Sequence, residues 1–208
     1  NTAIQSTQAN MIQSFDSDGF TQGSDMNASG TNYGSFTWKA GTTSGISGGT
    51  ITPTSYSINT TSGVGIYAYT ATGVAGTIPH GLGRKPIGNA GVINGAPETY
   101  IMYVFADVKG FSSFGYYRGN GSVDGPWIYT GFRPSVFWMK KTSGDSNWTM
   151  FNNKSNPTNE VYTSIDMNVT NDEDNDLGYN DVDFCATGVK IREDNNDLNQ
   201  SGQDFLYA

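Results

Sequence analysis

The stretch that decides the fold is TYIMYVF at residues 99–105, in which aromatic and β-branched residues dominate. Its aromatic residues occupy the second, fifth and seventh positions, and NYGSFTW at residues 32–38 repeats this spacing. DFLY at residues 204–207 begins a third copy. Such side chains pack well on a pleated sheet, where alternate residues point to opposite faces. We therefore predict a β-strand at each copy and name it the closing strand.

A second element alternates with the closing strand. Residues 69–73, followed by Ile-Pro-His-Gly at 78–81, parallel residues 117–121, followed by Ile-Tyr-Thr-Gly at 128–131. Gly119-Asn120-Gly121 is a tight-turn signal between two aromatic segments. We therefore predict an opening hairpin in each of these two places.

Internal self-similarity of this kind indicates duplicated modules. Residues 1–41 are predicted to be the strand-forming tail end of a preceding repeat unit. A shortened unit follows at 42–107, called the first repeat, and a full unit at 108–208, called the second repeat.

The composition favours the same fold class. The chain of 208 residues contains 27 glycines and four leucines, whereas helices are rich in leucine, alanine, glutamate and lysine. Many short strands separated by Gly-, Asn- and Ser-rich turns are typical of sandwiches and jelly rolls. The predicted fold is all-β, with two β-sandwich-like or jelly-roll-like modules built from a degenerate internal repeat.

The rare residue types exclude several classes of protein. One cysteine, Cys185, leaves no disulfide framework, and one histidine, His80, leaves no multi-histidine metal site. His80 has Pro and Gly neighbours that mark a turn. No apolar run is long enough to span a membrane, so membrane insertion is not expected. Residues 160–208 hold 12 acids and 2 bases of a chain with net charge −8, and no basic groove for nucleic acid is visible.

The order of these elements resembles a repeat that is common in large structural proteins of marine tailed phages. The matching stretches are Asp18–Thr21, Asn27–Thr31, Trp38–Gly41, Tyr69–Gly73, His80–Gly83, Gly119–Ser122 and Tyr129–Pro134. Members of that family are tail fibres, appendages or other virion components with lectin-like β-sandwich modules. The resemblance implies a viral protein located in the virion. This sequence departs from the family after Pro86, where a long stretch with several strands is missing.

An acidic loop at residues 171–183 is a candidate calcium site. Its oxygen-bearing side chains alternate as the ligands of a calcium loop do, and carboxylates in one place repel unless a cation neutralises them. The candidate ligands are Asp172, Asp174, Asp176, Asn180 and Asp183. The alternative is a solvated acidic loop, because Leu177 stands where such a loop needs glycine. No other cofactor is expected.

Aromatic side chains of the second repeat are candidates for a glycan-binding surface, since aromatic faces bury apolar area while their polar tips stay wet. The candidate residues are Trp127, Tyr129, Tyr117 and Phe132. Trp127 is the tryptophan expected to be exposed, and Trp38, Trp138 and Trp148 are expected in the core. The alternative is that all of these aromatics fill β-sandwich cores.

The sequence therefore predicts a non-enzymatic structural component of a tailed-phage virion, which self-associates and docks to other virion proteins. The third closing strand (Asp204, Phe205, Leu206 and Tyr207) is a candidate assembly segment that completes its pairing with another chain. The alternative function is a receptor- or glycan-binding module of a phage adsorption protein, with a host surface glycan as its partner. Paired carboxylates for glycoside hydrolysis are not singled out by any spacing.

Overall fold

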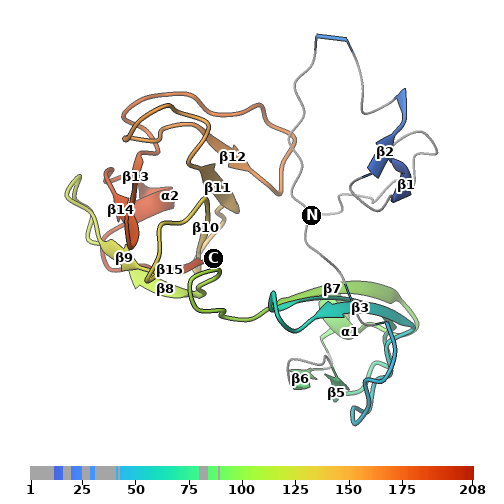
Figure 1. Cartoon of the computed structure of the whole chain (residues 1–208). Helices are drawn as coiled ribbons and strands as arrows, with labels where there is room; N and C mark the ends of the chain where they lie inside the picture. The colour runs from blue at the N-terminus through green and yellow to red at the C-terminus, as the bar shows by residue number, and fades with distance from the viewer. Residues whose placement is uncertain are drawn as a thin grey trace. The chain divides into compact units, whose positions relative to one another are not determined.

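The computed structural model describes residues 12–15, 20–24, 29–30, 41, 43–79, 84–88 and 90–208. The chain divides into two compact parts, residues 1–38 and 39–208, which are considered separately (Figure 1). In the first part, strands β1 (Ile12–Phe15) and β2 (Phe20–Gln22) form an antiparallel pair. The closing strand predicted at 32–38 and the turn predicted at His80 lie outside the described residues.

The second part confirms the predicted all-β fold. The helices among its described residues are single turns, α1 (Gly91–Asn94) and α2 (Asn196–Asn199). All strand pairs are antiparallel. The two repeats lie here, and each forms its own pair of sheets.

The second repeat contains a five-stranded sheet and a three-stranded sheet. The first has the order β12 (Ser164–Asp166), β11 (Thr149–Asn152), β10 (Val136–Lys141), β15 (Asp204–Tyr207) and β8 (Gly115–Arg118). The second has the order β13 (Val182–Cys185), β14 (Gly188–Ile191) and β9 (Trp127–Tyr129).

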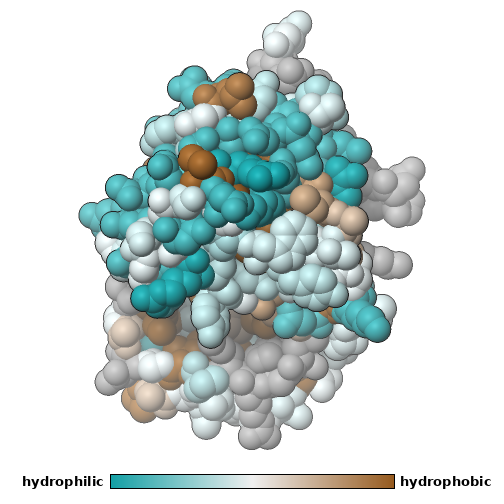
Figure 2. All heavy atoms as spheres, turned by 90° about the vertical axis from the view of Figure 1, so that its left-hand side faces the viewer, coloured by the Kyte–Doolittle hydropathy of each residue, from teal (hydrophilic) through white to brown (hydrophobic). Residues whose placement is uncertain are grey.

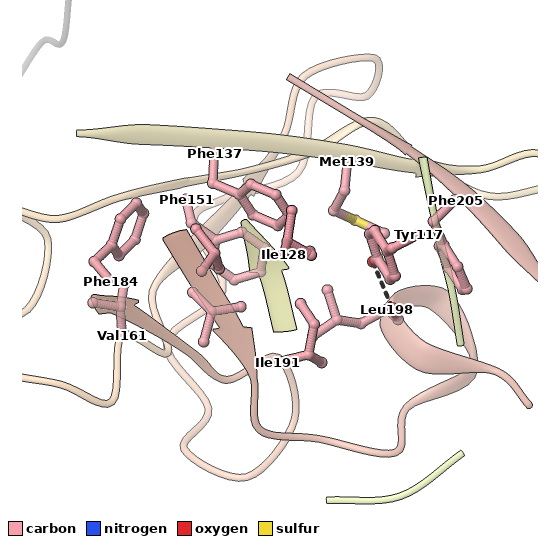
Figure 3. Close-up of a cluster of buried hydrophobic side chains, with 12 residues drawn as sticks. Tyr117, Ile128, Phe137, Met139, Phe151, Val161, Phe184, Ile191, Leu198 and Phe205 are labelled. Atoms are coloured by element: carbon pink, nitrogen blue, oxygen red, sulfur yellow. Dashed lines mark hydrogen bonds between the residues drawn. The ribbon is translucent and has the colours of Figure 1, made fainter. Parts of the chain in front are cut away.

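One hydrophobic core joins these two sheets into a β-sandwich. Phe137, Phe151 and Phe205 project from the five-stranded sheet, and Phe184 and Ile191 from the three-stranded sheet (Figure 3). The same alternation that buries these residues turns their neighbours in each strand toward the outer faces. Burial of aromatic and branched side chains between the sheets is the dominant favourable term in a fold of this kind.

The first repeat is a smaller sandwich. Its three-stranded sheet has the order β3 (Ser55–Asn59), β4 (Val64–Thr70) and β7 (Thr99–Phe105), and β5 (Gly76–Pro79) pairs with β6 (Arg84–Ile87). Its core includes Tyr69, Ile78 and Ile87, with Tyr100 and Met102 packed against them.

An aromatic pair shows that the two repeats are copies of one design. Tyr69 of β4 stacks on the closing-strand residue Tyr100, with ring centroids 5.5 Å apart. Tyr117 of β8 stacks in the same way on Phe205, at 4.9 Å. We call β4 and β8, which carry these tyrosines, the opening strands. The hydroxyl of each tyrosine also donates to the carbonyl of the residue before the last one of the helical turn, at 2.6 Å for Tyr69 and 2.7 Å for Tyr117.

A fully buried asparagine ends the helical turn in both repeats. In the first, Asn94 Oδ1 accepts from Thr72 N at 3.0 Å, and its Nδ2 donates to two backbone carbonyls. In the second, Asn199 Oδ1 accepts from Asn120 N at 2.8 Å, and its Nδ2 again donates to two backbone carbonyls. This asparagine ties the turn after the opening strand to the segment before the closing strand.

The repeats differ in what lies between these shared elements. We equate β5 with β9, since Ile78 and Ile128 are core residues at the equivalent position. We equate β6 with β14, since these are the strands that pair with β5 and β9. The described residues of the first repeat contain no counterpart of β10 to β13. As a result, β15 lies inside its sheet, whereas β7 forms the edge of its own.

Candidate binding sites in the second repeat

The second repeat contains a polar cavity of about 390 Å³ beside strands β11 and β12. Its walls come from these strands, from the acidic loop and from α2. The lining residues are Asn147, Thr149, Ser164, Asp166, Asn171, Asp172, Asp174, Tyr179, Asn180 and Asp197. The face of the second repeat that is turned to the viewer in Figure 2 is mostly hydrophilic, as the acidic excess of residues 160–208 predicts.

Neutral donors hold the carboxylate of Asp166 at the wall of this cavity. Asn147 Nδ2 donates to one of its oxygens at 2.6 Å, and Thr149 Oγ1 donates to the other at 2.8 Å. Asn168 Nδ2 in turn donates to Asn147 Oδ1 at 3.0 Å, which fixes the orientation of the amide. The cavity wall is therefore rich in hydrogen-bond acceptors at fixed positions.

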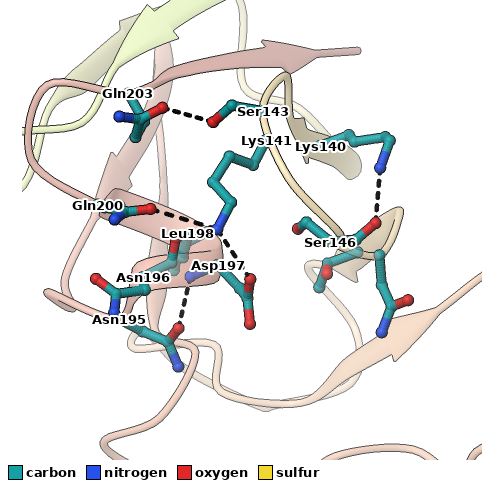
Figure 4. A network of polar contacts seen from close by, with 12 residues as sticks. Lys140, Lys141, Ser143, Ser146, Asn195, Asn196, Asp197, Leu198, Gln200 and Gln203 are labelled. Atoms are coloured by element: carbon teal, nitrogen blue, oxygen red, sulfur yellow. Dashed lines mark hydrogen bonds and ion pairs between the residues drawn. The ribbon is translucent and has the colours of Figure 1, made fainter.

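A lysine from β10 balances the charge at the α2 side. Lys141 Nζ lies 3.4 Å from Asp197 Oδ1 and also donates to Gln200 Oε1 and the Asn196 carbonyl (Figure 4). The Lys141 side chain is 11% exposed, so most of its length packs against the protein. Asn195 caps α2 by accepting from Asp197 N at 2.8 Å. These contacts hold the polar side chains at the α2 side of the cavity in fixed positions.

The structure brings together part of the predicted calcium loop. Asp172, Asp174 and Asn180 line the cavity, whereas Asp176 is exposed and outside the lining. Asp183 is buried, and its Oδ2 lies 2.6 Å from both Nε and Nη2 of Arg192.

The hydrogen bond from Arg192 to Asp183 raises the pKa of the guanidinium, so Arg192 stays charged. Asp183 is therefore engaged by Arg192 and does not line the cavity with Asp172 and Asp174. The described residues contain no group of three or more acidic, His or Cys side chains placed to hold a metal ion.

The predicted glycan-binding aromatics divide between the surface and the core. Trp127 and Tyr129 project from the outer face of β9, 45% and 67% exposed, and Phe132 is half-buried just beyond them. Tyr117 belongs to the core, and burial raises the pKa of its hydroxyl well above 10. It is therefore unavailable as a stacking platform, and the exposed aromatic residue of that strand is Tyr116.

The tryptophans expected in the core also differ from each other. Trp138 is half-buried on the outer face of the five-stranded sheet, where its ring meets Phe105 edge-on at 6.0 Å. Trp148 is 37% exposed, and neither tryptophan belongs to the core, so the expectation that they lie there was wrong. Trp38, which was also expected in the core, lies outside the described residues.

The third closing strand is not an open assembly segment. Asp204–Tyr207 forms β15, which pairs with β10 on one side and with β8 on the other. Because both edges are occupied within the chain, the expectation that these residues complete their pairing with another chain is wrong.

The sequence did not predict the buried carboxyl of Asp181, which directly precedes β13. Asp181 is 2% exposed, and its Oδ2 accepts from Gly178 N at 3.0 Å. Its Oδ1 has no hydrogen-bond partner among the described residues. Burial raises the pKa of this carboxyl. Neighbouring acids in the sequence gave no signal that one of them is enclosed.

Comparison with known proteins places the chain in a family. No curated protein and no solved structure matches it significantly. Within the described part of the chain, no helix has the length and apolar character needed to cross a membrane. The model of a family described as a domain of unknown function, DUF7483, matches residues 1–88 and residues 86–208, and the chain therefore belongs to this family.

Proposed function

We propose that this chain is a non-enzymatic structural component of a tailed-phage virion that associates with copies of itself and docks to other virion proteins. The resemblance of its ordered sequence elements to marine phage structural proteins supports the virion assignment. The observation that carries the association is the sheet edge at β7. In the second repeat the equivalent strand is covered by β10, whereas no described strand covers β7.

The environments of the cysteine and of several carboxylates are in keeping with a structural role. Burial raises the pKa of the Cys185 thiol, which favours the unreactive protonated form. The Asp166 carboxylate is engaged by neutral donors, and those of Asp183 and Asp197 are paired with bases. These contacts hold the three carboxylates in place, as a structural role requires.

Two measurements test the proposal. Sedimentation velocity over a wide range of protein concentrations is expected to show a concentration-dependent oligomer. Mass spectrometry of purified phage particles is expected to find the chain in multiple copies per particle. A strictly monomeric chain at all concentrations contradicts self-association, and absence from particles of a phage that expresses the chain contradicts the virion role.

The polar cavity favours a second candidate, the binding of a host surface glycan. Its fixed acceptors and its size suit one or two sugar rings, whose hydroxyls donate to carboxylates. A glycan array is expected to give saturable binding that Asp172→Ala removes. Asp145→Ala, an exposed acid outside the cavity lining, serves as the control with the same change of charge. Binding that persists in Asp172→Ala but is lost in Trp127→Ala places the glycan on the β9 aromatics instead.

A further inference from the structure

The outer edge of β7 presents a regular row of backbone groups. Glu98 and Ala106, which flank the strand, both form backbone hydrogen bonds with the β4 side. Because antiparallel residues face the neighbouring strand alternately, the even-numbered residues of β7 bond to β4. The odd-numbered residues Thr99, Ile101 and Tyr103 therefore direct their N–H and C=O groups to the other edge. No described strand pairs with that edge.

The second repeat shows what such an edge receives. The stacked pairs equate Tyr100 with Phe205, and hence Ile101 with Leu206. At the corresponding edge of β15, Thr142 N donates to the Asp204 carbonyl, and Ala208 exchanges two hydrogen bonds with Trp138. The closing strand can thus bind one more antiparallel strand at these alternate positions, and in the second repeat this strand is β10.

The composition of β7 suits contact with a copy of itself. Natural edge strands are commonly protected by charged residues or proline, and the sequence TYIMYVF contains neither. Ile101 and Tyr103 are 46% and 59% exposed. The first repeat as a whole carries two bases and two acids and is neutral, whereas the chain has a net charge of −8. Two copies that approach through this repeat therefore avoid most of their mutual repulsion.

We propose that β7 pairs with β7 of a second copy, antiparallel across a two-fold axis at Ile101. The inference rests on the self-association proposed above and names its contact. In this register Ile101 lies opposite the partner's Ile101, and Thr99 lies opposite the partner's Tyr103. Each of the three residue pairs exchanges two hydrogen bonds, so the unpaired groups of all three residues are used. The contact is isologous and closes as a dimer.

A symmetric disulfide tests the pairing directly. Directly opposed residues of a hydrogen-bonded pair have Cα atoms about 5.5 Å apart, inside the range that a disulfide spans. In a Cys185→Ser background, Ile101→Cys is expected to form a dimer that thiol reductant separates. Leu206→Cys is the matched control, because Leu206 is the equivalent residue, is 45% exposed and lies on an edge that β10 already occupies. It is expected to stay monomeric under the same oxidation.

A mixture of two variants tests the register. Thr99→Cys and Tyr103→Cys are expected to cross-link much more efficiently when mixed than when either is oxidised alone. Equal cross-linking of either variant with itself overturns the proposed axis.

A charge at the axis provides an independent readout. Ile101→Lys brings two ammonium groups together at the contact and is expected to weaken association at least about tenfold, since like charges directly opposite each other are unfavourable. Leu206→Lys is expected to leave association unchanged, and circular dichroism checks that both variants fold. An oligomer that forms without the Ile101→Cys disulfide and tolerates Ile101→Lys overturns this pairing but keeps the proposed self-association. A chain that never associates overturns both.

Discussion

The buried asparagine of each repeat offers the sharpest test of the duplicated design. Asn199→Ala removes the acceptor for Asn120 N and the donors to the Ser122 and Glu193 carbonyls. Three backbone groups lose their partner in a partly buried place. Leaving such a group unsatisfied costs about 1 kcal/mol or more. The expected loss of stability is therefore about 3 kcal/mol, a fall in Tm of about 12–24 °C if the second repeat, with about 100 residues, unfolds as one unit.

Hydrogen exchange resolved by peptide locates the effect. Asn199→Ala is expected to speed exchange in the opening strand β8 and the closing strand β15. Asn94→Ala breaks the equivalent bonds to Thr72, Val74 and Gly88, and is expected to act on β4 and β7 instead. Urea unfolding followed by tryptophan fluorescence reports mainly on the second repeat, where three of the four tryptophans (Trp127, Trp138 and Trp148) lie.

Asn196→Ala is the matched control, because Asn196 stands on the same helical turn with an exposed side chain. It is expected to change stability by less than about 0.5 kcal/mol. The reasoning is refuted if Asn199→Ala is no more destabilising than Asn196→Ala. It is also refuted if Asn94→Ala and Asn199→Ala speed exchange in the same peptides.

Three further predictions concern the acidic side chains. Burial raises the pKa of Asp181, so the stability that its protonated carboxyl contributes is fully present below about pH 4 and is lost as pH rises through the pKa of the folded state. Asp181→Asn should therefore raise Tm near neutral pH and reduce the fall in Tm between acidic and neutral pH. Arg192→Met should cost at least about 2 kcal/mol in urea unfolding by stranding the buried Asp183, whereas Arg118→Met, in an exposed pair, should cost less than about 1 kcal/mol. Calcium should leave Tm unchanged, because Asp183 is engaged by Arg192; a calcium-dependent rise that Asp174→Ala abolishes would contradict this.

The sequence predicted the closing strands β7 and β15 because their signal is local. The two predicted opening hairpins were wrong, because β4 pairs with β7 and β8 with β15, whereas β5 and β9 lie in other sheets. The spacing of aromatics at residues 99–105 and 204–207 coincides with β7 and β15, and the Tyr69 and Tyr117 segments end the two opening strands. A pattern of this kind depends on neighbouring residues, which the sequence displays directly.

The sites were harder to predict because they depend on which face a residue occupies and on contacts between distant strands. Tyr116 and Tyr117 are adjacent, and a shift of one residue decides which is buried. The spacing of the acidic loop resembles a ligand pattern, but strand β13 commits Asp183 to Arg192. Asp166 and Asn147 are 19 residues apart and meet because β11 and β12 pair. No local motif announces such a contact.

The elements that the two repeats share thus form different surfaces, depending on which strands are inserted between them. In the second repeat, the segment between β9 and β14 adds β10 to β13, which cover the closing strand and form much of the polar cavity. In the first repeat, β5 ends at Pro79 and β6 already begins at Arg84, so the opening tyrosine, the buried asparagine and the helical turn remain while the covering strand is absent. The buried asparagine makes this possible, because it satisfies the turn without help from the inserted strands. We infer that shortening the first repeat is what exposes a neutral edge for association, while the acidic excess stays with the repeat that carries the cavity.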